Sequence, residues 1–160
     1  MIPEPVTDDL YPVADLRAYL AGRWTISRAM EDRRRGERGS FAGRAEFAPE
    51  GEDLLAYRED GRLALGGFET LAHQRYLYAF PAPSSVGRRA PHRAEVRFAD
   101  GRPFHDLDLS DGLWAAGHRC APDTYRGRFR ALGPDRWWVR WIVTGPRKDQ
   151  ALESLFTRAA

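Results

Sequence analysis

Residues 102–126 read RPFHDLDLSDGLWAAGHRCAPDTYR, and their alternation of apolar and polar side chains predicts short β-strands. Successive side chains of a strand point to opposite faces, so a half-buried strand has one apolar face and one charged face. Asp106 and Asp108 alternate with His105 and mark the face that contacts solvent. We therefore expect His105 to point into the protein, and Phe104 to point outward with the two aspartates.

The two strand segments that follow carry further polar side chains on faces that we expect to be buried. In the first of them, Arg119 marks the solvent face, which places Trp114, His118 and Cys120 inside. In the second, Tyr125 alternates with arginine residues and also points inward. Imidazole, thiol and phenol groups on buried strand faces indicate a candidate site.

The turns between these segments predict how the strands pair. The Asp-Gly pair between the first two segments favours a two-residue hairpin loop, which places His105 opposite His118. At residues 121–123 two loops are possible, and they place Tyr125 opposite either His118 or Cys120. Either loop keeps His105, His118 and Tyr125 near one level of the sheet, where Cβ atoms lie close enough for hydrogen bonding between side chains. We call this row of three residues the polar belt.

Two further hairpins extend this register. An Asp-Gly turn before the quoted stretch places Val96 opposite His105. A three-residue loop at residues 133–135 pairs Gly127 with Trp141, whose ring would cover the bare backbone of the glycine. The belt is therefore expected to cross several neighbouring strands.

The chain after residue 22 continues as short strands, with turn residues roughly every ten positions. Asp60-Gly61 is one such predicted turn, whereas Gly66-Gly67 is expected only to kink a strand. We expect a short helix near residues 13–21 and strands at residues 22–31, 40–48, 53–59, 62–80, 92–99, 102–109, 113–120, 123–131, 136–144 and 150–158. A meander of this length removes its unpaired edges by closing, so the sequence predicts an all-β, antiparallel up-and-down barrel of about eight to ten strands with room for a ligand inside.

Length and composition indicate a single soluble domain that spans residues 1–160. No apolar run approaches the roughly 20 residues of a membrane helix, so we expect no membrane partner. The first ten residues, MIPEPVTDDL, have acids and prolines in place of a secretory signal, and we expect the protein to be cytoplasmic. Cys120 is the only cysteine, which excludes an internal disulfide.

The basic residues gather in two short clusters although the net charge is only +2. One cluster spans Arg33–Arg38, and the other contains Arg88, Arg89 and Arg93. We expect solvated loops at both places and no nucleic-acid partner, because a charge this small does not provide a continuous basic surface.

Gly22-Arg23-Trp24 (GxW) begins the first expected strand, and Arg158 lies in the last one. This arrangement resembles the calycins, the group of lipocalins and fatty-acid-binding proteins, in which an arginine covers the GxW tryptophan. The resemblance implies a calycin-like barrel whose narrow end is closed by a cation–π contact between Arg158 and Trp24. Three motifs are similar to those of an uncharacterised calycin-like domain family: FHxLDL (residues 104–109), HxCxxDxY (118–125) and GPxKD (145–149). This resemblance implies the barrel and leaves the identity of the ligand open.

The expected interior matches a binding site for a small apolar or aromatic molecule, because ligand sites are mostly apolar with a few placed polar groups. The polar belt would supply hydrogen bonds, and Lys148 would lie at the rim. The expected ligand-binding residues are His105, His118, Tyr125, Trp114, Trp141, Phe98, Phe129, Tyr78 and Lys148. We expect no cofactor.

Three alternatives use the same interior. An enzyme doing acid-base chemistry, such as isomerisation, cyclisation or dehydration, would employ His118, His105, Tyr125, Asp123 and Cys120. A metal or haem site would instead use His105, His118 and Cys120 as ligands. In the third alternative the belt is a structural hydrogen-bond network that fixes strand register, and the protein acts through its surface.

Overall fold

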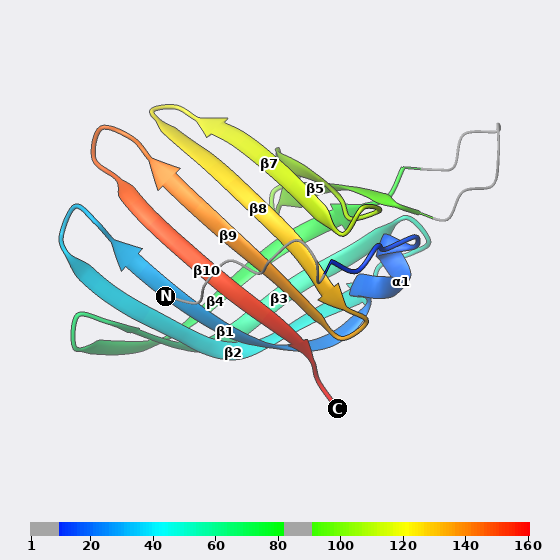
Figure 1. Ribbon diagram of the computed structural model, residues 1–160, viewed down its shortest axis with the longest axis horizontal. Helices are drawn as coiled ribbons and strands as arrows, with labels where there is room; N and C mark the ends of the chain where they lie inside the picture. The colour runs from blue at the N-terminus through cyan, green and yellow to red at the C-terminus, as the bar shows by residue number, and fades with distance from the viewer. Residues whose placement is uncertain (1–9, 82–90) are drawn as a thin grey trace.

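An all-β barrel with one short helix forms the fold in the computed structural model, which describes residues 10–81 and 91–160 (Figure 1). The described elements are α1 (Leu16–Leu20), β1 (Gly22–Asp32), β2 (Glu37–Pro49), β3 (Leu54–Leu65), β4 (Phe68–Ala79), β5 (Arg93–Phe98), β6 (Pro103–Asp108), β7 (Leu113–Cys120), β8 (Asp123–Gly133), β9 (Arg136–Thr144) and β10 (Asp149–Arg158). The strands form one antiparallel sheet in the order β6-β5-β4-β3-β2-β1-β10-β9-β8-β7. The predicted up-and-down architecture is confirmed.

The barrel is nearly closed, with a seam between β6 and β7. These strands are the two ends of the sheet order, and among the described residues no ladder of backbone hydrogen bonds joins them. Side chains cross the seam instead: the indole Nε1 of Trp114 donates to the carbonyl oxygen of Asp106 at 2.7 Å, and the rings of Phe104 and His118 lie 5.3 Å apart. The predicted hairpin pairing of His105 with His118 is therefore wrong.

The start of the described chain explains this seam. The carbonyl oxygen of Leu109 accepts hydrogen bonds from the backbone N–H groups of Gly112 and Val13, at 2.8 and 2.9 Å. Ala131 donates to the carbonyl of Gly112 and accepts from the N–H of Tyr11. The segment around Tyr11 and Val13 thus takes backbone partners at the end of the seam where a β6–β7 hairpin ladder would begin.

A β-bulge in β6 turns two consecutive side chains inward. Val96 pairs with His105, but the next residue of β5, Arg97, pairs with Pro103, so Phe104 is the extra residue. An extra residue breaks the strict alternation of side chains along a strand. Phe104 and His105 are both buried, and the prediction that Phe104 faces solvent is wrong.

The other predicted pairings around the belt are confirmed. His118 lies directly opposite Tyr125, which selects one of the two loops considered for residues 121–123. Gly127 pairs with Trp141, and a Cβ atom at Gly127 would lie only 2.8 Å from that ring. The pairing of β7, β8 and β9 around the belt therefore follows the sequence prediction, although Trp137, Trp138 and Val139 of β9 are buried consecutively.

The hairpin between β3 and β4 corrects a predicted turn. Asp60-Gly61 lies within β3, and the turn is at Gly66-Gly67, where φ is +55° and +80°. A Cβ atom at Gly61 would lie 2.4 Å from the carbonyl oxygen of Ala42 in β2. Gly61 is thus required for the close approach of two strands, whereas the glycines at 66 and 67 supply the left-handed backbone of a turn.

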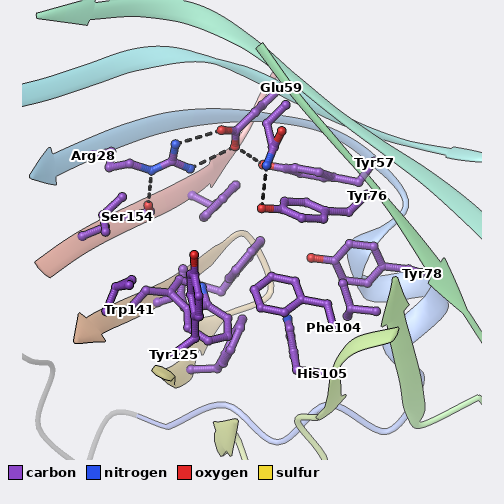
Figure 2. Close-up of a pocket in the computed structure, with 18 residues that line it drawn as sticks. Arg28, Tyr57, Glu59, Tyr76, Tyr78, Phe104, His105, Tyr125, Trp141 and Ser154 are labelled. Atoms are coloured by element: carbon purple, nitrogen blue, oxygen red, sulfur yellow. Dashed lines mark hydrogen bonds and ion pairs between the residues drawn. The ribbon is translucent and has the colours of Figure 1, made fainter. Parts of the chain in front are cut away.

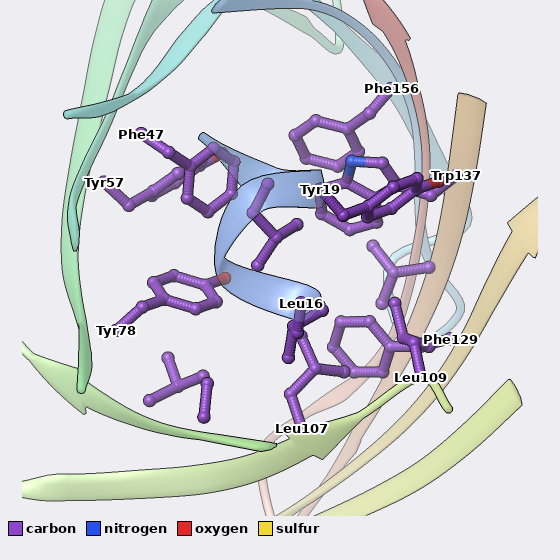
Figure 3. Close-up of a cluster of buried hydrophobic side chains, with 14 of the residues drawn as sticks. Leu16, Tyr19, Phe47, Tyr57, Tyr78, Leu107, Leu109, Phe129, Trp137 and Phe156 are labelled. Atoms are coloured by element: carbon purple, nitrogen blue, oxygen red, sulfur yellow. The ribbon is translucent and has the colours of Figure 1, made fainter. Parts of the chain in front are cut away.

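Helix α1 closes one end of the barrel (Figure 3). The carboxylate of Asp15 caps it by accepting from the N–H of Ala18 at 2.9 Å, and the buried Leu16, Tyr19 and Leu20 form its apolar stripe. The phenol of Tyr19 donates to backbone carbonyls of the β8–β9 turn, which fixes the helix to the barrel. No helix among residues 10–81 and 91–160 is long and apolar enough to cross a membrane.

Trp24 and Arg158 meet beside this helix. The guanidinium carbon of Arg158 lies 4.2 Å from the centroid of the Trp24 ring, and the indole N–H donates to the carbonyl of Leu20 at 2.8 Å. Arg158 also donates to the carbonyls of Tyr19 and Ala21. Helix α1, β1 and β10 are thereby joined at this end of the barrel.

Candidate ligand-binding cavity

A cavity of about 270 Å³ lies inside the barrel (Figure 2). This volume is near the lower end of the range for small-molecule sites. Its lining residues come from β1, β3, β4, β5, β6, β8, β9 and β10. Its apolar wall includes Phe104, Phe129, Trp137, Val139, Trp141 and Phe156.

An ion pair between Arg28 of β1 and Glu59 of β3 forms the opposite, polar side of the cavity. The guanidinium nitrogens Nη1 and Nη2 donate to Oε1 and Oε2 of the carboxylate at 2.8 and 2.9 Å. The Nε–H of Arg28 donates to Oγ of Ser154 at 2.7 Å, and its guanidinium lies 4.9 Å from the Phe41 ring centroid. Both charged side chains are largely buried, with 17% and 7% exposure, so each charge is neutralised by its partner.

This ion pair was not predicted from the sequence, although strand alternation places each of the two side chains on an inner face. Arg28 follows Ile26 on the inner face of β1, and Glu59 follows Tyr57 on the inner face of β3. The assumed turn at residues 60–61 placed Glu59 at a strand end. A charged residue on an otherwise apolar face was the feature that could have identified it.

The phenol side chains of Tyr57, Tyr76 and Tyr78 lie between the ion pair and the apolar wall. Tyr57 donates its hydroxyl hydrogen to Oε2 of Glu59, whereas the hydroxyl oxygen of Tyr76 accepts from Nε2 of Gln74 at 2.8 Å. Burial raises the pKa of Tyr57, Tyr76 and Tyr78 above the ordinary phenol value, so all three are protonated near neutral pH. Tyr76 and Tyr78 therefore retain hydroxyl hydrogens that no described residue accepts.

His105 contributes a neutral imidazole to the same cavity. Its Nδ1 lies 2.8 Å from the carbonyl oxygen of Asp106, and because a carbonyl only accepts, Nδ1 carries the hydrogen. Burial lowers the pKa of His105 to about 4, while the nearby Asp106 opposes this shift and His118 adds to it. Nε2 is then an unprotonated acceptor, and it has no hydrogen-bond partner among the described residues.

The members of the predicted belt are close to one another but not linked by hydrogen bonds among the described residues. Phe104 lies between the two histidines, with its ring 4.7 Å from His105 and 5.3 Å from His118. Tyr125 lines the cavity with His105, whereas His118 packs edge-on against Phe98, outside the cavity lining. The bulge at Phe104 is the physical reason for this separation.

The other predicted ligand-binding residues divide into two groups. Tyr78, Phe129 and Trp141 line the cavity. Phe98 stacks on Phe104 with ring centroids 4.6 Å apart, and Trp114 packs at the seam, so neither belongs to the lining.

Lys148, expected at the rim, and Cys120, expected inside, are both outside the cavity lining. Lys148 forms an ion pair of 3.1 Å with Asp123, and Cys120 is exposed at the end of β7. In the part of the chain that the structure describes, no three His, Cys, Asp or Glu side chains are grouped to hold a metal. The alternative metal site of His105, His118 and Cys120 is therefore not assembled.

The two basic clusters do not form one surface in the described residues. The exposed arginines of Arg33–Arg38 lie at the β1–β2 turn. Arg93 donates to the carboxylate of Asp106 across β5 and β6, and Arg88 and Arg89 lie outside the described residues.

Fold and cavity together define a nearly closed, antiparallel β-barrel with an internal pocket. The chain belongs to a family of unknown function, DUF6314, whose model matches residues 20–158. No curated protein matches the chain. Among solved structures, the S-type phycobiliprotein lyase CPES from Guillardia theta is similar, with 9% identity over 90% of both chains and a TM-score of 0.64. Identity this low shows a shared fold alone.

Two further solved structures match most of the chain with lower TM-scores. The first, EF1p2_mFAP2b bound to DFHBI, has 11% identity over 91% of this chain and 98% of its own, with a TM-score of 0.49. The second, a fluorescence-activating β-barrel designed de novo, has 16% identity over 92% of this chain and 100% of its own, with a TM-score of 0.47.

Proposed function

We propose that the protein binds a small, largely apolar and aromatic molecule inside its barrel. The cavity of about 270 Å³ between the aromatic wall and the Arg28–Glu59 pair is the observation that carries this proposal. Walls of aromatic rings with a few convergent polar groups are typical of small-molecule sites. His105 and Tyr125 of the predicted belt are among those polar groups, and His118 supports them through Phe104.

The shape of the wall favours a planar ligand. Phe104 and Trp141 are stacked with an interplanar angle of 20°, and Phe129 and Trp137 are stacked with an angle of 16°. Flat aromatic groups pack against such rings by offset stacking or edge-to-face contact, in addition to the gain from removing apolar area from water.

Native mass spectrometry of protein purified from its own host tests this proposal directly. We expect a bound molecule with a mass of a few aromatic rings, which dissociates on unfolding. A titration with N-phenyl-1-naphthylamine, an uncharged dye that fluoresces in apolar sites, provides a second measurement. The absence of both a retained molecule and dye binding would contradict the proposal.

A matched pair of variants tests whether the dye binds inside the barrel. Val143 lines the cavity, and its neighbour Thr144 is exposed on the outer face of β9. Val143→Phe fills the cavity and should weaken dye binding at least about tenfold, whereas Thr144→Phe should leave the affinity unchanged. Equal binding by both variants would place the dye outside the barrel.

A proton-transfer enzyme is the second candidate, because a neutral imidazole and several phenols line one cavity. A pKa of about 4 makes His105 a weak base, however, and acid-base catalysis is most effective when the pKa is near the working pH. We therefore place binding first. Chemical change of a retained molecule during incubation, lost in His105→Phe or His118→Ala, would reverse this order.

A further inference from the structure

The polar side chains that line the cavity predict the charge of its ligand. Among the described residues that line the cavity, only Arg28 and Glu59 are charged at neutral pH, and they form two parallel hydrogen bonds with each other. Ser154 and Tyr57 occupy further positions on the same two groups. In the part of the lining that the structure describes, no charge of either sign is therefore left to neutralise a charged group on a ligand.

The polar groups that remain among the described lining residues are neutral, and two of them lie in one row across the sheet. Tyr78 of β4 pairs with Val96 of β5, which pairs with His105 of β6. The Cα atoms of Tyr78 and His105 are thus separated by two strand spacings, about 10 Å, with the small Val96 between them. Figure 2 shows the hydroxyl groups of Tyr76, Tyr78 and Tyr125 directed toward the open space of the cavity.

These groups are complementary to an oxygen function on an aromatic ring. The hydroxyls of Tyr76 and Tyr78 donate hydrogen bonds, and Nε2 of His105 accepts one. Tyr78 and His105 are both nine-tenths or more buried. Neither the hydroxyl group of Tyr78 nor Nε2 of His105 has a hydrogen-bond partner among the described residues. Both groups line the cavity, so a bound molecule that forms hydrogen bonds with them gains affinity.

We propose that the cavity takes an uncharged, planar aromatic molecule whose phenol or carbonyl oxygen accepts from Tyr76 and Tyr78, with an adjacent O–H or N–H that donates to His105. This inference rests on the proposed function and specifies its ligand class. A phenol offers both halves of this pattern in a single hydroxyl group.

Three naphthalene probes of one shape and different charge test the proposal. We expect 2-naphthol to bind at pH 7, as measured by isothermal titration calorimetry. Anionic 2-naphthoate and cationic 2-naphthylmethylammonium should bind at least about a hundredfold more weakly, because each buries a charge without a countercharge. Tighter or equal binding of either charged probe would overturn the inference and leave small-molecule binding intact.

Two variants test the stated contacts. Tyr78→Phe removes one hydroxyl and keeps the ring, so it should weaken 2-naphthol binding roughly tenfold. Tyr11→Phe removes a hydroxyl outside the cavity and is the matched control, with no expected change. Equal affinity of the two variants would contradict the role of Tyr78.

A change of charge preference is the sharpest test. Glu59→Gln leaves Arg28 without its counterion, and 2-naphthoate should then bind about tenfold or more tightly than to the unmodified protein. Glu46→Gln removes a surface carboxylate that also pairs with an arginine, Arg23, and should change nothing. If Glu59→Gln keeps the original preference, the ion pair does not set the charge of the ligand.

The dye and the probes distinguish a wrong ligand class from a wrong proposed function. If N-phenyl-1-naphthylamine binds in the cavity but none of the three naphthalene probes does, the ligand class is wrong and the binding function stands. If neither the dye nor any probe binds and no molecule is retained, the proposed function falls and the inference with it. Thermal unfolding of each variant, followed by circular dichroism, identifies variants that fail to fold, and the probe series on the unmodified protein does not depend on them.

Discussion

A buried neutral imidazole at His105 makes the stability of the barrel depend on pH. In the unfolded chain this histidine takes up a proton near its ordinary pKa of 6.5, but in the folded protein the pKa is about 4. Between these values the unfolded state binds more protons, so stability falls as the pH decreases from about 6.5 to about 4 and is unaffected above 6.5. Asp106 and His118 are the neighbouring titratable groups that contribute to the shift.

We expect this histidine to lower the free energy of unfolding by roughly 2 to 3 kcal/mol between pH 7 and pH 4.5. Urea unfolding at both pH values measures it. The comparison is with His105→Phe, which lacks the titrating group and should lose less stability in acid by that amount. The same pH dependence in both proteins would show that other groups control it.

Gly127 is the second residue with a specific expected effect. A methyl group there would lie 2.8 Å from the Trp141 ring, which is part of the cavity wall. Gly127→Ala should therefore destabilise the protein by about 1 to 3 kcal/mol and alter tryptophan fluorescence. Gly117→Ala is the control on the neighbouring strand, because its Cβ atom would meet nothing closer than 3.9 Å. Equal stability of the two variants would contradict close packing at Trp141.

At the scale of elements, the Arg28–Glu59 pair connects β1 with β3 across the intervening β2. Arg28→Met should cost about 3 to 5 kcal/mol, because it leaves the carboxylate of Glu59 buried without a counterion. Adding Glu59→Leu removes that charge as well, and the double variant should recover most of the lost stability. Denaturant unfolding of the single and double variants measures this coupling. Additive losses would show that the two side chains do not depend on each other.

Most strands could be predicted from the sequence, because their inner and outer faces alternate regularly. The bounds of β7 and β9 are as predicted, and the pairing of Gly127 with Trp141 follows from turn length alone. The exceptions have local physical causes. A bulge turned Phe104 inward, and Gly61 serves a close strand contact instead of a turn.

The candidate site was harder to predict than the fold. His105 and Tyr125 could be placed inside because charged residues alternate with them on the opposite face. Arg28 and Glu59 are themselves charged, and each is stable inside only because the other is present. A single strand pattern does not contain such a pairing, since it depends on which strands become neighbours in the barrel.

For the whole molecule, the seam between β6 and β7 predicts a gradient of backbone protection. Alternate amides of β6 and β7 face the seam without a ladder partner among the described residues, whereas β1 is paired on both sides, with β2 and β10. Hydrogen exchange followed by NMR should therefore be faster for the seam amides than for the amides at the centre of β1. Uniformly slow exchange across β6 and β7 would show that a ladder closes the barrel in solution.

The pairing of β1 with β10 also determines when this protein can fold during its synthesis. Trp24 in β1 lies beside Arg158 in β10, so the first strand of the barrel pairs with the last one to be synthesised of these ten. Until β10 emerges, β1 and β9 are both unpaired edges and the interior stays open to water. The barrel therefore assembles after translation of β10, and the nascent chain depends until then on the local β-hairpins that follow one another from β1 to β4.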